Sequence, residues 1–254
     1  MFLAIFIYLG KFNFKNKFIF IIIFILLEIL IFLSGERASF FYLNLSAIFC
    51  IFLFSKFKKI RFFILTTSFL LIILISKFYP QYKERILDVT KHQIFNQAER
   101  QEGLSKNKEF YIFSKEHENH YKSAILMFKE NKVLGIGTKL FRKKCNEKKF
   151  IVSRESCSTH PHNTYIQLLA ETGILGFLQI FIIFLILIYY SLKHFFLKLI
   201  KKSILFNDFE IALLSALLIS LWPLVPTGNF FGNWISIIYY LPVGFLLFSL
   251  DKKI

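Results

Sequence analysis

Residues 18–33 read FIFIIIFILLEILIFL, a run of apolar side chains that only Glu28 interrupts. With its flanks the run reaches the roughly 20 residues that a helix needs to cross the hydrocarbon core of a bilayer. We therefore predict a membrane-spanning helix at this position.

Similar apolar runs recur along the chain and are bounded by lysines rather than by turn residues. Hydrophobic residues make up 56% of the sequence and charged residues 19%, with a mean hydropathy of +0.55. These values exclude a disordered chain and argue against an ordinary soluble domain. The predicted fold class is all-α, a polytopic membrane protein with about six transmembrane helices and one long, partly helical outer loop. The further apolar segments are 38–54, 62–76, 164–192, 204–224 and 234–250.

Residues 1–10 are apolar but too short to span a bilayer, and they lack the basic start and cleavage site of a signal peptide. Two interpretations are open. The segment is a short interfacial start, or it is the remnant of a seventh helix in a larger protein. We favour the remnant.

The net charge of +16 would suggest a nucleic-acid partner in a soluble protein. Here most basic residues outside the segment 77–159 lie in short connections that alternate so as to share one side of the membrane. The positive-inside rule makes that side cytoplasmic, so no nucleic-acid partner is predicted. The cytoplasmic residues are Lys11, Lys15, Lys17, Lys56, Lys58, Lys59, Arg61, Lys193, Lys198, Lys201, Lys202, Lys252 and Lys253.

The orientation divides the chain into three parts. Membrane helices occupy residues 1–76 and 164–254, and a large periplasmic loop occupies residues 77–163. The 18 basic and 10 acidic residues of segment 77–159 do not contradict an outward position, because loops longer than about 60 residues cross the membrane largely regardless of charge.

Arg37 is the one basic residue outside the loop that the cytoplasmic set does not contain. It lies in the tight outer turn Ser34-Gly35-Glu36-Arg37, against the topological bias, and this position indicates a function. The structural alternatives are a local pair with Glu36 or a side chain that reaches along the membrane surface.

The outer loop contains ordered elements. Tyr121, Ala124, Ile125 and Phe128 have the spacing of an amphipathic helix, and residues 131–137 (NKVLGIG) read as a helix stop followed by a glycine turn. Cys145 and Cys157 lie twelve positions apart in this loop, whereas Cys50 lies within a helix. An oxidising compartment permits a disulfide between the two loop cysteines, which we favour over two unpaired thiols.

The most informative stretch is residues 160–176, HPHNTYIQLLAETGILG. It places two imidazoles, His160 and His162, at the outer membrane face, where either can act as a general base or acid near neutral pH. Asn163, Gln167 and Glu171 recur every four residues and share a helix face. The glycines that follow, Gly173 and Gly176, offer a small-residue surface to another helix. The alternative is that the stretch only caps and packs a helix.

A metal site is not predicted. His117 and His120 are spaced i, i+3, but no carboxylate or cysteine cluster completes a set of ligands. We interpret these two histidines as solvated loop residues.

The chain resembles the superfamily of O-antigen ligases and O-antigen polymerases, membrane glycosyltransferases that use polyprenyl-linked glycans. The family signature is a His followed by Asn, Ser or Gln, nine residues, and Gly-x-x-Gly. His162-Asn163, residues 164–172 and the Gly173-to-Gly176 segment fit it without a gap. A GIG-type turn and an Arg in an SGER-like outer turn are also typical, and the second of these contains Arg37. Members commonly have more membrane helices, so the chain is expected to correspond to the C-terminal half.

The resemblance implies transfer of a glycan from undecaprenyl diphosphate to an acceptor hydroxyl, such as that of lipid A–core, at the periplasmic face of the bacterial inner membrane. It implies no metal or other cofactor, and membrane lipids as surroundings. The expected roles are His162 as general base and Arg37 as ligand of the diphosphate, with His160 and Asn163 orienting the base or binding sugar. Arg85 and Arg100 are candidates for further phosphate contacts, with a solvated charged surface as the alternative.

Other functions remain open at this level. An O-antigen polymerase or a protein O-oligosaccharyltransferase would share the donor and differ in the acceptor, and a non-catalytic fragment is a third alternative. A solute transporter would need intramembrane charges that act together, and Glu28 shows no evident partner on another helix.

Overall fold

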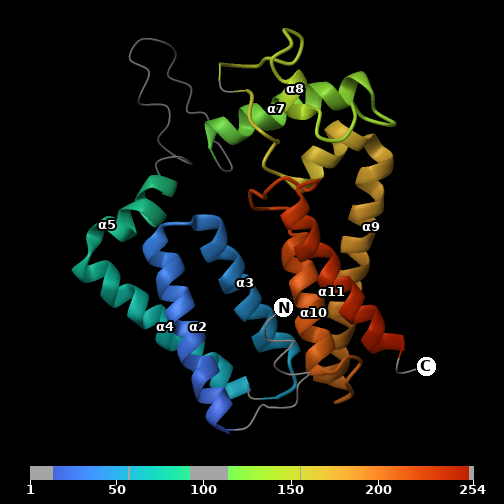
Figure 1. Cartoon of the computed structure of the whole chain (residues 1–254). Helices are drawn as coiled ribbons and strands as arrows, with labels where there is room; N and C mark the ends of the chain where they lie inside the picture. Colours follow the sequence, from blue (N-terminus) through green and yellow to red (C-terminus); the bar gives the residue numbers. More distant parts are fainter. Residues whose placement is uncertain (1–13, 57, 92–113, 155, 252–254) are drawn as a thin grey trace. The chain divides into compact units, whose positions relative to one another are not determined.

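The structure is a computed structural model that describes residues 14–251 except 57, 92–113 and 155. The described residues form helices and no strand. In chain order the elements are α2 (Phe14–Ser34), α3 (Arg37–Leu53), α4 (Lys58–Phe78), α5 (Pro80–Lys83), the π-helix η1 (Glu84–Asp88), α7 (Lys115–Glu130), α8 (Phe141–Lys144), α9 (Thr164–Ile200), α10 (Asp208–Ser220) and α11 (Asn233–Asp251) (Figure 1).

The chain divides into two compact units. Unit 1 consists of residues 1–82, 184–222 and 237–254, and unit 2 consists of residues 83–183 and 223–236. The predicted remnant helix at residues 1–10 lies outside the described residues.

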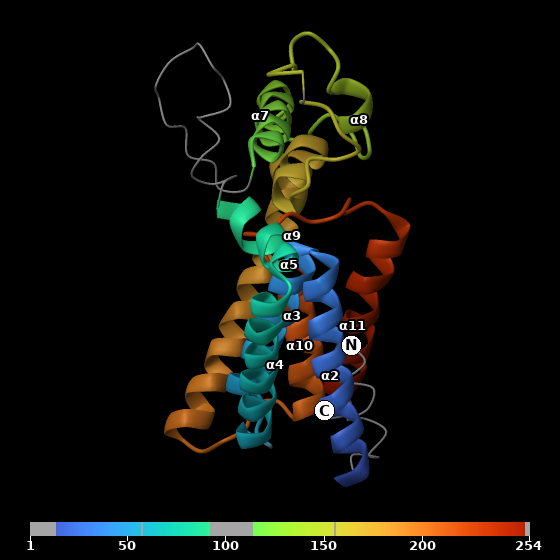
Figure 2. The same cartoon turned by 90° about the vertical axis from the view of Figure 1, so that its left-hand side faces the viewer.

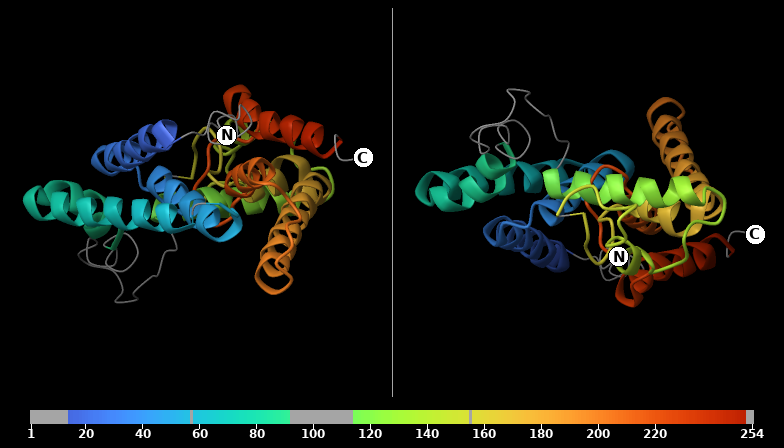
Figure 3. Two further views of the ribbon diagram at one scale, coloured as in Figure 1. Left: turned by 90° about the horizontal axis from the view of Figure 1, so that it is seen from below. Right: turned by 90° about the horizontal axis from the view of Figure 1, so that it is seen from above.

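In unit 1, helices α2, α3 and α4 pack against one another, and α10 packs against α3 (Figures 1, 2 and 3). Each helix buries one side, as Phe32, Ile51 and Ile72 show, while large apolar side chains such as Phe63 and Leu70 are exposed. Exposed apolar side chains along helices of this length are what a lipid environment requires. Unit 1 is therefore built as part of a membrane protein.

Three described helices are long and apolar enough to cross a membrane, namely Lys59–Phe78 of α4, α9 and α11. Ile21–Ser34 and α3 are apolar but shorter. The predicted crossing at 204–224 contains only the 13 residues of α10, below the usual lower limit of roughly 17, because the chain leaves the helix before Pro223 and Pro226. The described helices thus support a polytopic membrane protein, and the count of six stays a prediction.

Two basic residues assigned to the cytoplasmic side also cap a helix. Lys198 Nζ donates to the carbonyl oxygens of Phe52 and Phe54, at 2.7 and 2.8 Å, and Arg61 Nη2 donates to that of Phe54 at 3.0 Å. These carbonyls lie at the C-terminal end of α3, where a helix favours positive charge. The positions therefore have a structural reason besides topology.

Glu28 is buried in unit 1, where it lies beside Asn44 of α3 and Ser68 of α4. Neither side chain reaches full hydrogen-bond geometry with the carboxyl group. Helix packing thus brings two uncharged polar side chains from other helices to Glu28, although these residues lie far apart in the sequence.

Unit 2 has a core of its own, to which α7, α8 and the first part of α9 contribute. Ala124, Met127, Phe141 and Ala170 are buried together in it. The prediction of a helix followed by a glycine turn is confirmed, since α7 begins after Ser114 and ends at Glu130. Its buried face is rotated from the predicted apolar stripe, because polar residues share the interior. The buried residues of α7 are Asn119, His120, Ser123, Ala124 and Met127.

The glycine turn after α7 docks against a kink in α9. Gly173 has φ 66° and ψ −164°, which divides α9 into two segments. The amide of Ile136 donates to Ala170 O at 2.9 Å, and the amide of Ile174 donates to Lys132 O at 2.8 Å. A side chain at Gly173 would overlap the Val133 carbonyl group. The neighbour of Gly173 is therefore this turn and not the helix that the small-residue pattern suggested.

Candidate functional site: a histidine cluster at the start of α9

Asn163 sets the beginning of α9. Its Oδ1 accepts hydrogen bonds from the amides of Tyr165 and Ile166, at 3.0 and 3.2 Å, and its Nδ2 donates to Pro223 O at 2.9 Å. The first two bonds are those of a helix N-cap, and the third joins the cap to the segment before α11. Both the oxygen and the nitrogen of the Asn163 side-chain amide thus form hydrogen bonds within unit 2.

His160 is held by two hydrogen bonds. Its Nε2 lies 3.1 Å from Thr227 O and its Nδ1 lies 2.9 Å from Thr159 Oγ1. Because a carbonyl group only accepts, Nε2 carries the proton and Nδ1 accepts from the hydroxyl group. Burial lowers the pKa of His160, against the hydrogen bond to Thr227 and the charge of Glu171. His160 is therefore a neutral anchor whose ring nitrogens are both occupied.

His162 is held through its backbone and not through its ring nitrogens. Its φ is 59°, in the left-handed region, and its carbonyl oxygen accepts from the amide of Thr227 at 2.9 Å. The side chain is half-buried, and we find no hydrogen bond from its ring to another of the described residues. Burial, followed by the charges of His160, His117 and His120, lowers the pKa of His162 to about 4. The ring is neutral at physiological pH and has nitrogens available to a substrate.

His117 and His120 project from α7 onto His162. The ring centroids of His117 and His120 lie 5.3 and 5.5 Å from that of His162, and the centroid of His160 lies 4.1 Å from it. The interpretation of His117 and His120 as solvated loop residues is wrong, because α7 folds over the HPHN turn and buries His120. Their i, i+3 spacing just after the N-cap Ser114 was the available signal, since it places both rings on one helix face.

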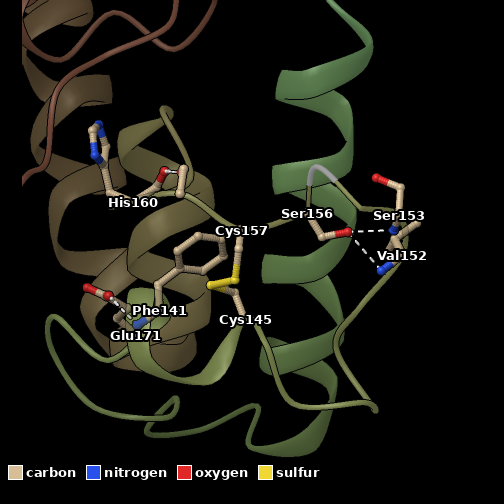
Figure 4. Close-up of a disulfide and its surroundings, with 9 residues drawn as sticks. Phe141, Cys145, Val152, Ser153, Ser156, Cys157, His160 and Glu171 are labelled. Atoms are coloured by element: carbon tan, nitrogen blue, oxygen red, sulfur yellow. Dashed lines mark hydrogen bonds between the residues drawn. A yellow bond between two sulfur atoms is a disulfide. The ribbon is translucent and has the colours of Figure 1, made fainter.

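Glu171 organises the floor of the site. Its carboxylate accepts from the amide of Phe141 at 3.0 Å, as Figure 4 shows. It also accepts from the amide of Lys139 at 3.0 Å and from Gln167 Nε2 at 3.1 Å. Glu171 and Gln167 are almost fully buried, so the predicted shared helix face is confirmed for this pair. A buried carboxylate with three donors is a rigid structural group.

Gln167 connects this floor to the segment before α11. Its Nε2 donates to Asn229 Oδ1 at 2.7 Å, and its Oε1 accepts from the amide of Phe230 at 3.0 Å. Nothing in the HPHN motif indicates this segment. Its Thr227 also contacts the turn that contains His160 and His162. Sequence reasoning missed it, because the contact joins residues about 60 positions apart.

Cys145 and Cys157 form a disulfide with Cα atoms 5.2 Å apart, the pairing that the sequence analysis favoured (Figure 4). Next to it, Ser156 Oγ accepts from the amides of Val152 and Ser153, at 2.8 and 2.6 Å. The bridge closes the loop that leads from α8 into the histidine turn.

The family model for the O-antigen ligases matches residues 18–181, which is more than half of the chain. The chain belongs to the O-antigen ligase family. Membership confirms the resemblance, since the match contains both the SGER turn and the HPHN turn, and it implies a lipid-linked glycan transferase of the ligase or polymerase type in the bacterial inner membrane. No curated protein and no solved structure matches the chain.

The other candidate residues of this O-antigen ligase family member lie apart from the histidine turn in the sequence. Arg37 is the exposed first residue of α3 in unit 1, and the preceding N-cap residue, Glu36, makes no side-chain cap hydrogen bond. Arg85 lies in η1, and Arg100 falls outside the described residues. The structure thus brings together His160, His162 and Asn163 and adds His117 and His120 to them.

Among the described side chains, no group of three or more His, Cys, Asp or Glu residues is arranged to hold a metal ion. The histidine cluster consists of rings in edge and tilted contact.

Proposed function

We propose that the chain transfers a glycan from undecaprenyl diphosphate to an acceptor hydroxyl, such as that of lipid A–core, at the periplasmic face of the membrane, with His162 as general base. The observation that carries the proposal is the state of His162. Its ring is neutral, half-exposed and without a hydrogen bond to other described residues, whereas the ring nitrogens of neighbouring His160 are both occupied.

The proposed step is a displacement at the anomeric carbon of the donor sugar. An imidazole nitrogen of His162 accepts the proton of the acceptor hydroxyl as its oxygen bonds to that carbon. The bond from the carbon to the diphosphate oxygen breaks, and the diphosphate leaves with the electron pair. A general base in this position contributes about 10²- to 10⁴-fold to the rate.

The length of α9 supports a site at the level of lipid headgroups. The 21 residues between Glu171 and Lys193 carry no charge. At about 1.5 Å per residue they span about 31 Å, the thickness of the hydrocarbon core, so its outer boundary falls near Gly173. The first segment of α9, from Thr164 to the kink, is about 14 Å long and keeps His162 within roughly that distance of the boundary.

Arg37 is the proposed ligand of the diphosphate. It begins α3 next to an N-cap residue that leaves the first-turn amides without a side-chain cap. A guanidinium group offers a planar, permanently charged fork for phosphate oxygens, and a helix N-terminus favours anions. The loss of this charge should weaken donor binding and stabilisation of the leaving group.

The test uses the full chain in proteoliposomes with undecaprenyl-diphosphate-linked glycan and lipid A–core, and mass spectrometry of the acceptor as readout. We expect His162→Ala to reduce transfer at least about 10²-fold, and Lys148→Ala, an exposed loop change, to leave it intact. Unchanged transfer with a chelator present would support a metal-independent reaction. Transfer that survives His162→Ala, or native chain that transfers nothing, would overturn the proposal.

A further inference from the structure

Two histidines outside the family motif contact the proposed base. His117 and His120 precede His162 by more than 40 positions, and their rings lie against it. This packing brings together several imidazoles, each with an unperturbed pKa of about 6.5.

Both rings are fixed by their surroundings. His117 Nδ1 lies 2.7 Å from Ser114 Oγ, the same hydroxyl that caps α7. His120 is buried on the same helix, whose other buried residues, Ala124 and Met127, belong to the core of unit 2. The helix that carries both rings therefore cannot move away from His162 without loss of core contacts.

Fixed imidazoles in contact resist protonation of one another. A first proton on any ring raises the free energy of a second proton on its neighbour. The titratable groups facing His162 are His160 from its own turn and His117 and His120 from α7. The segment 223–236, which packs against the turn through Thr227, contains no charged residue. The negative charge of Glu171 raises the pKa of His160 and therefore opposes the effect of burial.

We propose that His117 and His120 are positioning residues of the transfer reaction, which hold the His162 ring in place and keep it in the neutral form that accepts a proton. The assignment rests on the proposed function for its catalytic meaning. Its physical content, the coupling of three rings, is measurable without a substrate.

The direct test is an NMR titration of the full chain in detergent with ¹³Cε1-labelled histidine, with signals assigned by single His→Asn changes. In His117→Gln and His120→Gln we expect the midpoint of His162 to rise by roughly one pH unit, because one source of like charge is gone. Lys122→Gln is the matched control, since it removes an exposed positive charge from α7 without a ring contact. His120→Phe retains the bulk of a ring and distinguishes packing from charge. An unchanged midpoint in all three histidine variants would overturn the proposal.

Transfer assays separate this proposal from the proposed function. The acidic limb of the transfer rate should move to higher pH in His117→Gln. If His162→Ala abolishes transfer and the limb does not move, only the role of α7 fails. If His162→Ala transfers normally, the function fails although the coupled titration can still stand.

The turn after α7 exposes apolar side chains and supports a second, independent inference. Val133 and Leu134, in the turn after α7, are 56% and 65% exposed. The turn is tied to the second segment of α9 by the hydrogen bond from the Ile174 amide to Lys132 O, and Leu175 of that segment is itself half-exposed. We define the membrane tip as residues 132–134.

The position of the membrane tip follows from α9. The outer boundary of the hydrocarbon core falls near Gly173, and a side chain on Gly173 would overlap the Val133 carbonyl group. The exposed apolar side chains of the tip therefore lie beside the start of the long apolar run of α9. Lys132 and nearby Lys129 are exposed, and such residues favour anionic headgroups.

The geometry points to the membrane tip as a lipid-contacting anchor, with Val133 and Leu134 in the outer leaflet and Lys132 among its headgroups. This anchor would keep the turn that packs against the kink of α9 at a constant depth in the membrane. It does not depend on the proposed function.

The test is Leu134→Trp in vesicles of phosphatidylethanolamine and phosphatidylglycerol that contain brominated lipid. Since the chain has two native tryptophans, the signal is the difference from native protein. We expect quenching to be stronger with bromine near the headgroup than near the acyl-chain end, and to be absent for Lys148→Trp. No quenching of Leu134→Trp by either lipid would overturn the anchor and favour a protein partner on this surface.

Discussion

Units 1 and 2 of this O-antigen ligase family member are stabilised in different ways. Among the described residues, the interior of unit 1 is mostly apolar although Glu28, His194 and Glu210 are buried in it, and its helices expose apolar residues on their other side. Unit 2 buries His160, Gln167 and Glu171 near a disulfide, and Gln167 is hydrogen-bonded to both Glu171 and Asn229. Lipid tolerates many apolar packings, but buried polar groups require specific partners. Unit 2 should therefore respond more strongly to single substitutions.

The largest effect is expected for Gly173→Ala. Its φ and ψ lie in a region essentially restricted to glycine, and the new methyl group would meet the Val133 backbone, so we expect destabilisation of about 3 kcal/mol or more. The control is Gly244→Ala in α11 of unit 1, where nothing lies within 4 Å and alanine favours the helix by up to about 1 kcal/mol. Thermal unfolding in detergent measures both. Equal effects would remove the contrast between the units.

Loss of the disulfide comes next. The pair Cys145→Ser and Cys157→Ser opens a loop of about a dozen residues, for which chain entropy predicts a loss of about 3 kcal/mol. Cys50→Ser in unit 1 removes a free thiol and should change little. The readout is the thermal midpoint with and without reductant. Reductant should lower the midpoint of the native protein and of the Cys50→Ser variant, and should leave that of the double variant unchanged.

A smaller loss is expected for Glu171→Gln. The amide retains one acceptor oxygen but turns an NH₂ group toward backbone donors, so we expect destabilisation of about 2 kcal/mol. Glu130→Gln is the matched control, because that exposed carboxylate pairs with the exposed Lys149 and should contribute little to stability. Chemical denaturation compares the two. A neutral result for Glu171 would show that the buried network is not what stabilises unit 2.

The smallest effect concerns pH. The pKa of His162 in the folded chain is about 4, below the unfolded value, so the unfolded state gains a proton first as the pH falls. As the pH falls from about 6.5 to 4, the free energy of unfolding should decrease by about 1 kcal/mol after allowance for the partial exposure of the ring. Above about pH 6.5 the contribution of His162 should be fully present. The decrease should be weaker in His162→Asn. A stability that rises on acidification would contradict the depressed pKa.

Sequence patterns located the candidate site well and its surroundings poorly. The HPHN motif and its helix face lie within one local stretch, so the spacing of Asn163, Gln167 and Glu171 was readable. The contacts of His162 with His117 and His120, and of Gln167 with Asn229, join separate parts of the chain. Neither residue type nor period signals such contacts. Gly173 illustrates both points. The sequence predicted a close contact at this glycine, but it did not show which segment makes that contact.

The sequence alone determined that this chain is a helical membrane protein, because hydrocarbon thickness and the cost of unpaired backbone groups in lipid leave long apolar runs few alternatives. Its resemblance to the O-antigen ligase family rested on the motif that begins at His162, and the family model confirmed it. The sequence also determined which histidine is the best candidate for the base. Only the tertiary structure decided that α7 brings two further imidazoles to that base and that a glycine turn, not a helix, fills the space at Gly173. Such contacts depend on which surfaces meet across long loops, and that is set by the packing of a whole core.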